Sequence, residues 1–254
     1  MWRAIYPGFA CGILRAMNLL LLDADQHMGQ GRYRLTERQR DHVRHILKLE
    51  NGAQCRAGLL NGPMGKLVLV DANKTNELDG LFTAEYDPPA PLPLSLLLAL
   101  PRPKMLKRML IDATSLGVKR IVLLNSWKVD KSYWQTPELK AHQLQWKMRL
   151  GLEQARDTQM PELLLAHRFK PFVEDQLAEW LRGDCYVAHP GPYPRLPAGR
   201  TAETTLALGP EGGWTDYEID MLVQHGFQCG HFGQRILRAE TALPAITAHI
   251  MTTP

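Results

Sequence analysis

Two glycine-bearing segments near the carboxyl end of the chain hold residue types that a binding site needs. The first is Leu208-Gly-Pro-Glu-Gly-Gly-Trp214, between a predicted strand and a helix with a Thr-x-x-Glu capping box. Its glycines and proline leave the backbone bare, so a ligand can approach main-chain N–H and C=O groups. The segment is neither a P-loop nor a G-x-G-x-x-G fingerprint. The pattern alone fits a ligand-binding loop and a plain strand–helix turn about equally well.

The second segment is Phe232-Gly-Gln-Arg-Ile-Leu-Arg-Ala-Glu-Thr241, which also follows a predicted strand and leads into a helix. Arg235 and Arg238 flank two apolar residues, and charges held among apolar groups are costly unless they are paired or functional. Two simpler interpretations stay open. Arg238 pairs with Glu240, or Glu240 interacts only with the dipole of the helix that it opens.

Lysines and arginines gather in two further places. Arg40, Arg44 and Lys48 are spaced four apart, which predicts that they line one face of a helix capped by Thr36. A second cluster opens another predicted helix, where the helix dipole disfavours positive charge; it contains Arg102, Lys104 and Lys107. We interpret both clusters as phosphate contacts to a nucleic acid, with solvated helix faces as the alternative.

Composition narrows the class of protein. The chain has 254 residues, 45% of them hydrophobic, and a formal net charge of +4, which argues against wholesale disorder and permits a nucleic-acid partner. The four cysteines are far apart and His42-x-x-His45 has no third ligand at a suitable spacing, so no metal is expected. The lack of cysteine pairs predicts a reduced, cytoplasmic protein, and no apolar run is long enough for a membrane span.

The proline-rich segment 87–93 predicts a stiff linker between two domains. We expect residues 1–16 to be an extension or a mis-assigned start before Met17. Residues 17–86 should form a small β-rich domain with one helix, including strands at 54–60, 66–71 and 81–86.

Residues 94–254 alternate between strand and helix patterns, which predicts an α/β domain with a largely parallel sheet. Such sheets bind ligands at the carboxyl ends of their strands. The expected strands are 94–100, 120–124, 163–166, 184–188, 205–208 and 227–231, and the expected helices are 104–116, 137–156, 172–181, 215–225 and 240–251.

The paired carboxyl-terminal motifs closely resemble the RsmE family, the uridine-N3 methyltransferases of 16S ribosomal RNA in the SPOUT superfamily. The resemblance extends over nearly the whole chain from Met17 on. Further matches are His42, Ile46-Leu-Lys-Leu49, Gly52, Leu116-Gly-Val118, Glu153-Gln154 and Pro161-Glu162. The chain departs from the family pattern where a K-x-x-E-L-G segment is replaced by Asp112-Ala-Thr-Ser115-Leu-Gly117, where E-Q-S-G-R becomes Glu153-Gln-Ala-Arg-Asp157, and at Gln234, where proline is usual.

The resemblance implies a PUA-like β-barrel domain followed by an α/β domain with a carboxyl-terminal trefoil knot. It also implies a homodimer, with 16S rRNA or the small ribosomal subunit as partner. S-adenosylmethionine (SAM) would sit in the knot, between loops at 189–190, 209–213 and 232–238. The implied cofactor-binding residues are His189, Pro190, Leu208, Gly209, Pro210, Glu211, Gly212, Gly213, Phe232, Gly233, Arg235, Ile236, Leu237 and Thr241.

Methyl transfer to uracil N3 requires loss of a weakly acidic proton and stabilisation of charge on the flanking carbonyl oxygens. Arg238 is the candidate cation, and Glu240 is the candidate base or the residue that orients Arg238. The alternatives are a non-catalytic RNA-binding protein that keeps the SPOUT fold, and a methyltransferase with a different RNA target. A small-molecule α/β enzyme would leave both basic clusters unexplained.

Overall fold

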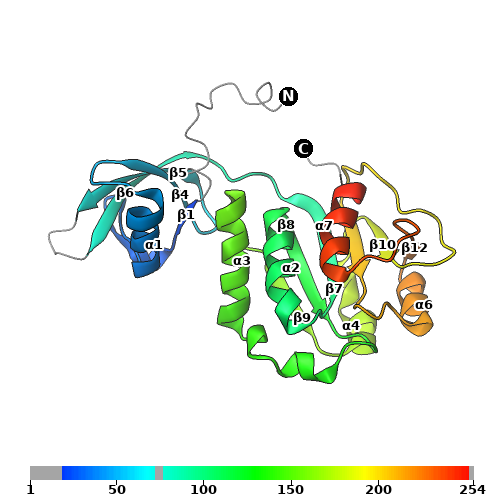
Figure 1. The fold of residues 1–254 in the computed structure, drawn as a ribbon. Helices are drawn as coiled ribbons and strands as arrows, with labels where there is room; N and C mark the ends of the chain where they lie inside the picture. The colour runs from blue at the N-terminus through cyan, green and yellow to red at the C-terminus, as the bar shows by residue number, and fades with distance from the viewer. Residues whose placement is uncertain (1–18, 72–76, 252–254) are drawn as a thin grey trace. The chain divides into compact units, whose positions relative to one another are not determined.

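The computed structural model describes residues 19–71 and 77–251. Residues 1–16 and Met17, the subject of the prediction about the start, lie outside this range. Contacts divide the chain into two compact units. The first comprises Met1–Pro89 with Leu152–Met160, and the second Ala90–Gly151 with Pro161–Pro254 (Figure 1).

The first unit contains a six-stranded sheet in the order β1-β4-β5-β6-β3-β2. Strand β1 runs parallel to β4, and the other neighbouring pairs are antiparallel. Leucines from β1 and β5 form the centre of its core, because one side chain in two points inward. The strands are β1 (Leu20–Leu22), β2 (His27–Gly29), β3 (Arg32–Arg34), β4 (Gln54–Leu59), β5 (Met64–Asp71) and β6 (Leu78–Tyr86), with a 3₁₀ turn at Ala24–Gln26.

The capping box predicted at Thr36 is present, with Thr36 N donating to Gln39 Oε1 at 2.9 Å. The α-helix that it starts, α1 (Glu37–Asp41), is nevertheless short and continues as a π-helix over His42–Leu47. Lys48 then lies in the left-handed region at φ +54°. The prediction that Arg40, Arg44 and Lys48 line one helix face is therefore wrong, because a π-helix bonds i to i+5 and Lys48 is outside it.

The second unit contains a six-stranded sheet in the order β12-β10-β11-β7-β8-β9, and all five neighbouring pairs are parallel. This confirms the predicted α/β class. Strand β7 is buried at successive residues, Leu96, Leu97 and Leu98, so both faces of the sheet are covered. The strands are β7 (Leu92–Ala99), β8 (Val118–Leu124), β9 (Glu162–Ala166), β10 (Asp184–Ala188), β11 (Thr204–Leu208) and β12 (Phe227–Gly230).

The helices of the second unit differ from the predicted ranges at two places. The helix predicted over Pro137–Arg156 is a 3₁₀ turn, Pro137–Leu139, followed after an extended Lys140 by α3 (Ala141–Ala155). The helix predicted over Phe172–Leu181 is divided at Gln176, whose φ of −125° leaves the helical region. The helices of this unit are α2 (Pro103–Ser115), α3, α4 (Phe169–Asp175), α5 (Leu177–Trp180), α6 (Asp216–Gln224) and α7 (Ala239–Ile250), with a further 3₁₀ turn at Lys131–Gln135.

Helices α2 and α7 pack against each other, while α4 contacts α6 (Figure 1). The apolar face of α2 includes Leu106, Met109, Leu110 and Ala113, which are spaced at helical intervals and fully buried. Among the described residues, no helix combines the length and apolar character that crossing a bilayer requires.

Leu97 offers a test of the sheet core, since it is fully buried and pairs with Ala207 on one side and Val122 on the other. We expect Leu97→Ala to lower the free energy of unfolding by about 2–5 kcal/mol, because it leaves a cavity between covered faces. Val223→Ala, at an exposed position of α6, should change it by less than about 0.5 kcal/mol. Urea unfolding of both variants measures the difference, and equal stabilities would contradict this account of the core.

Candidate functional site

Three loops start at one edge of the parallel sheet because three neighbouring strands end there in register. Strand β10 lies between β11 and β12, and its last residue, Ala188, pairs with Leu208 and with Gly230. The residues that follow each strand are therefore brought together, although they are far apart in the sequence. This edge is where parallel sheets bind their ligands.

A cavity of about 440 Å³ opens between these loops. The residues predicted to hold the cofactor all line it except Thr241, which is exposed on α7. That these residues bind the cofactor stays a prediction. The sequence analysis missed seven further lining residues: Lys128, Ala188, Trp214, Asp216, Ala239, Ala242 and Ile246.

The glycine loop after β11 needs glycine for its geometry at one position. Gly213 has φ +70°, which L side chains rarely adopt, and its N–H donates to Pro210 O at 2.8 Å. A Cβ at Gly213 would lie 3.3 Å from Cε1 of His189. The loop then enters α6 through the predicted capping box, in which Thr215 N donates to Glu218 Oε2 at 2.9 Å.

The side chain of Lys128 forms hydrogen bonds with the backbone of this glycine loop. Its Nζ donates to Gly212 O at 2.9 Å and to Trp214 O at 3.3 Å. Lys128 follows β8, a strand that is not adjacent to β11, so its spacing in the sequence gave no indication of the contact. The signal that could have found it is its position just beyond the carboxyl end of a parallel strand.

Two polar atoms in the cavity wall have no hydrogen-bond partner in the part of the chain that the structure describes. Nδ1 of His189 and Nε1 of Trp214 are buried and make no hydrogen bond among the described residues. Burial lowers the pKa of His189, and the nearby charge of Lys128 lowers it further against a smaller opposing effect of Asp216. His189 is therefore neutral at pH 7. A buried, unpaired polar group is costly, so both atoms indicate a place for a ligand or water.

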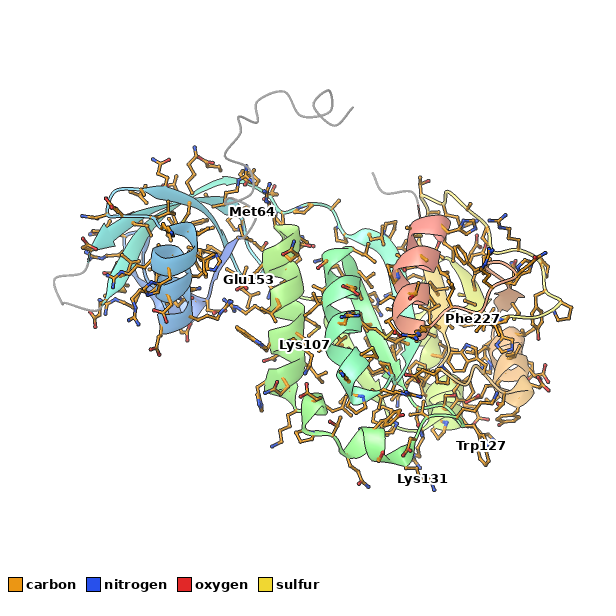
Figure 2. All side chains as sticks on the ribbon, in the orientation of Figure 1. Met64, Lys107, Trp127, Lys131, Glu153 and Phe227 are labelled. Carbon is orange, nitrogen blue, oxygen red and sulfur yellow. The ribbon has the colours of Figure 1, made fainter. Side chains whose placement is uncertain are left out.

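The second basic cluster meets the rim of this cavity at one residue. Arg102 N donates to Glu211 Oε1 at 3.2 Å, and the Arg102 guanidinium lies 3.9 Å from the same carboxylate. Lys104 and Lys107 are exposed on α2, with Lys107 labelled in Figure 2. Arg40, in the first unit, is only 15% exposed and forms ion pairs with Glu37 and Asp41.

Arg238 and Glu240 do not line the cavity, although Leu237 and Ala239 on either side of Arg238 do. Arg238 is exposed at the start of α7, and Glu240 is half-buried in its first turn. Within the described residues the two side chains form no ion pair with each other. In the same part of the chain, no three His, Cys, Asp or Glu residues gather as a metal site would require.

The sequence profile of the RNA methyltransferase domain family matches residues 88–251. The chain belongs to this family. Curated relatives named ribosomal RNA small subunit methyltransferase E include one from Treponema pallidum, 28% identical over 83% of this chain and 81% of the relative. Another, from Synechocystis, is 28% identical over 91% of this chain and 76% of the relative. The resemblance to the RsmE family is thereby confirmed.

Solved structures share the fold at low sequence identity. The small subunit methyltransferase E from Neisseria gonorrhoeae, bound to S-adenosyl methionine, superposes with a TM-score of 0.72 at 18% identity, covering 91% of this chain and 95% of that one. A Legionella pneumophila protein solved with SAM gives the same TM-score at 22% identity, covering the same shares of the two chains. Both likenesses concern the fold.

The residues that depart from the family motifs have structural contacts of their own. Ser115 Oγ donates to Gly151 O at 3.2 Å, within the second unit. Asp157 is 3% exposed, and its Oδ1 accepts a hydrogen bond from Gln159 N at 2.9 Å. Burial raises the pKa of Asp112, against the opposing charge of Arg108. Gln234 is exposed in the loop before α7.

The depressed pKa of His189 predicts a pH dependence of stability. The unfolded chain binds a proton at His189 near pH 6.5, while the folded chain binds it only at lower pH. Stability from this residue is therefore complete above about pH 6.5 and is lost as the pH falls through the folded pKa. We expect the melting temperature of the parent to fall more steeply than that of His189→Asn as the pH falls from about 7 to 5. His42 also has a lowered pKa but is present in both proteins, so parallel profiles would contradict the assignment to His189.

Proposed function

We propose that this protein is a SAM-dependent methyltransferase that methylates N3 of a uridine in 16S rRNA of the small ribosomal subunit. The observation that carries the proposal is the cavity of three glycine-bearing or basic loops at the carboxyl ends of β10, β11 and β12, in a chain of the RNA methyltransferase family. The curated relatives that it matches over most of their length are named for this rRNA activity.

The residues present fit SAM. The cavity volume of about 440 Å³ lies in the usual range for small-molecule sites. Its wall offers both apolar surface, from Leu208 and Ile246, and two unpaired polar atoms, on His189 and Trp214. Because Gly209 and Gly213 have no side chains, the cofactor could lie close to the backbone there. When bound, SAM supplies an electrophilic methyl group.

The remaining chemistry belongs to side chains of this protein. A proton must leave uracil N3, and negative charge then spreads to the two carbonyl oxygens beside it. We propose that Arg238 stabilises this charge, because its guanidinium is exposed and its chain neighbours Leu237 and Ala239 line the cavity. Glu240, which does not pair with it among the described residues, is the proposed acceptor of the proton or a positioning residue for substrate.

The finer features of the architecture are also proposals. We infer that the second unit is a SPOUT domain whose three loops form a trefoil knot, and that the first unit is a PUA-like domain that binds RNA. We further infer a cytoplasmic homodimer. RNA binding is supported by exposed cations that could contact phosphates. They are Lys48 in the first unit and Arg102, Lys104 and Lys107 in the second.

The function is tested by mapping modified nucleotides in rRNA from cells with and without the protein. The expected result is one uridine of 16S rRNA that loses N3 methylation when the gene is deleted and regains it on complementation. Methylation of another RNA would identify a different target. Unchanged modification of all RNAs would favour the non-catalytic RNA-binding alternative.

Two glycines of the cavity wall separate the effect of backbone geometry from that of added volume. Gly213→Ala places a side chain at φ +70°, whereas a Cβ at Gly233 meets nothing within 4 Å. We expect Gly213→Ala to cost about 1–2 kcal/mol of stability and to weaken SAM binding. Gly233→Ala should bind SAM within a few-fold of the parent. Calorimetry measures both, and equal affinities would separate the glycine loop from the cofactor site.

Arg238 is tested in single-turnover methylation. Because it would act on charge that develops in the transition state, Arg238→Ala should lower the rate by about 10²–10³-fold while SAM affinity stays within a few-fold. Arg238→Lys should rescue poorly, since a point charge does not replace a planar guanidinium. Arg235→Ala is the matched comparison, because Arg235 lines the cavity and its loss should weaken SAM binding. A near-parental rate for Arg238→Ala would contradict the catalytic role.

A further inference from the structure

A second cavity, of about 660 Å³, lies in the same unit and shares no lining residue with the first. It is formed by the residues after β8 and β9 and by the start of α6. The two cavities are neighbours along the backbone, because Lys128 and Asp216 line the first while the residues on either side of each line the second. Its wall consists of Asn125, Ser126, Trp127, Val129, Lys131, Arg168, Phe169, Lys170, Pro171, Thr215, Tyr217 and Glu218.

Two aromatic side chains at this cavity are left largely in water. Trp127 is 86% exposed and Tyr217 is 55% exposed. Both belong to the wall of the second cavity, and Trp127 is labelled in Figure 2. Large aromatic groups usually bury most of their area, so two exposed rings at one cavity indicate a surface that is covered by a partner. Flat aromatic faces are suited to stacking on bases.

The charges of the wall are complementary to phosphate. Lys131, Arg168 and Lys170 are exposed cations of this cavity, of which Lys170 also forms an exposed ion pair with Glu174 at 3.6 Å. The carboxylate in the wall, Glu218, is 2% exposed. It accepts hydrogen bonds from Trp127 N at 2.8 Å and from the backbone N–H and hydroxyl of Thr215. Its carboxylate is therefore hydrogen-bonded within the protein and is not exposed to a ligand in the cavity.

Ser126 adds an independent indication of a ligand. It lines the cavity and is 3% exposed, and its Oγ makes no hydrogen bond among the described residues. Leaving a buried hydroxyl unpaired is unfavourable, and a base or phosphate oxygen in the cavity would satisfy it. Next to it, Asn125 has its amide held by a hydrogen bond from Trp134 Nε1 at 2.8 Å, so its orientation is fixed.

We propose that the second cavity holds an unpaired nucleotide of the substrate RNA, with its base on Trp127 and Tyr217 and its phosphate on the cations of the wall. The proposal rests on the proposed function, which supplies an RNA substrate. Single-stranded RNA is recognised by this combination of stacking and backbone charge. Because consecutive residues at 127–129 and at 215–217 line the two cavities in turn, a nucleotide bound here would hold the strand beside the proposed site of methyl transfer.

The test measures binding of a single-stranded oligouridylate of about eight nucleotides, by fluorescence anisotropy, together with SAM binding by calorimetry. Trp127→Ala should weaken RNA binding roughly 5- to 150-fold, the effect expected for the loss of one stacked base. Its affinity for SAM should not change. Trp127→Phe retains an aromatic face and should bind within a few-fold of the parent. Trp146→Ala, a second exposed tryptophan in the same unit, is the matched control and should bind RNA normally.

Lys131→Ala gives a second readout. Losing one phosphate contact should reduce the slope of log affinity against log salt by about 0.7 for a single strand. Parental RNA affinity in Trp127→Ala, or an equal loss in Trp146→Ala, would overturn the proposal. So would a loss seen only with assembled subunits and not with bare RNA, since it would indicate a ribosomal protein in the cavity.

These outcomes are separable from those of the proposed function. If the parent methylates 16S rRNA and Trp127→Ala binds and methylates equally well, the second cavity is not a nucleotide site although the function stands. If no RNA depends on the protein for methylation, the proposed function fails. Loss of oligouridylate binding in Trp127→Ala would then still support a nucleotide site.

Discussion

Parallel pairing of β10 with β11 on one side and β12 on the other is the constraint on which the site depends. The chain makes these strands in the order β10, β11, β12, but in the sheet β10 lies between the other two. Ala188 therefore pairs with the last residue of each neighbour, Leu208 and Gly230. A shift of either pairing by one residue would reverse the facing of every side chain in that strand and move its loop along the edge. The register thus determines where the cavity lies.

Local features of this arrangement were predictable from the sequence because they arise from neighbouring residues. Capping boxes at Thr36 and Thr215 are reciprocal hydrogen bonds across three residues, and both are present. Alternating strand and helix patterns indicated a parallel sheet, because parallel neighbours need a crossover connection. The glycine loop was visible for the same reason, since its conformation is set within a few residues.

Features that depend on distant contacts were not predictable. The π-helix over His42–Leu47 begins without a break after α1, and nothing in the spacing of Arg40 and Arg44 indicated the change of period. Lys128 reaches Gly212 across 84 residues, so only the folded sheet brings the two together. The second cavity joins residues that follow β8 and β9 to the start of α6. In the sequence, the lining residues of this cavity are separated by up to about ninety positions.

The walls of the two cavities differ in net charge, and this difference suits them to different ligands. In the first, the charges of Lys128 and Arg235 are balanced by those of Glu211 and Asp216 and His189 is neutral, so the wall has little net charge. In the second, Glu218 is buried and accepts hydrogen bonds from backbone N–H groups, while Lys131 and Arg168 are exposed. The accessible wall therefore has net positive charge, together with the exposed rings of Trp127 and Tyr217. A compact cofactor with its own charges suits the first wall, and a stacked base with a phosphate suits the second. Because residues 127 to 129 and 215 to 217 line the two cavities alternately, a nucleotide in the proposed second site would contact the same short segments that border the proposed cofactor cavity.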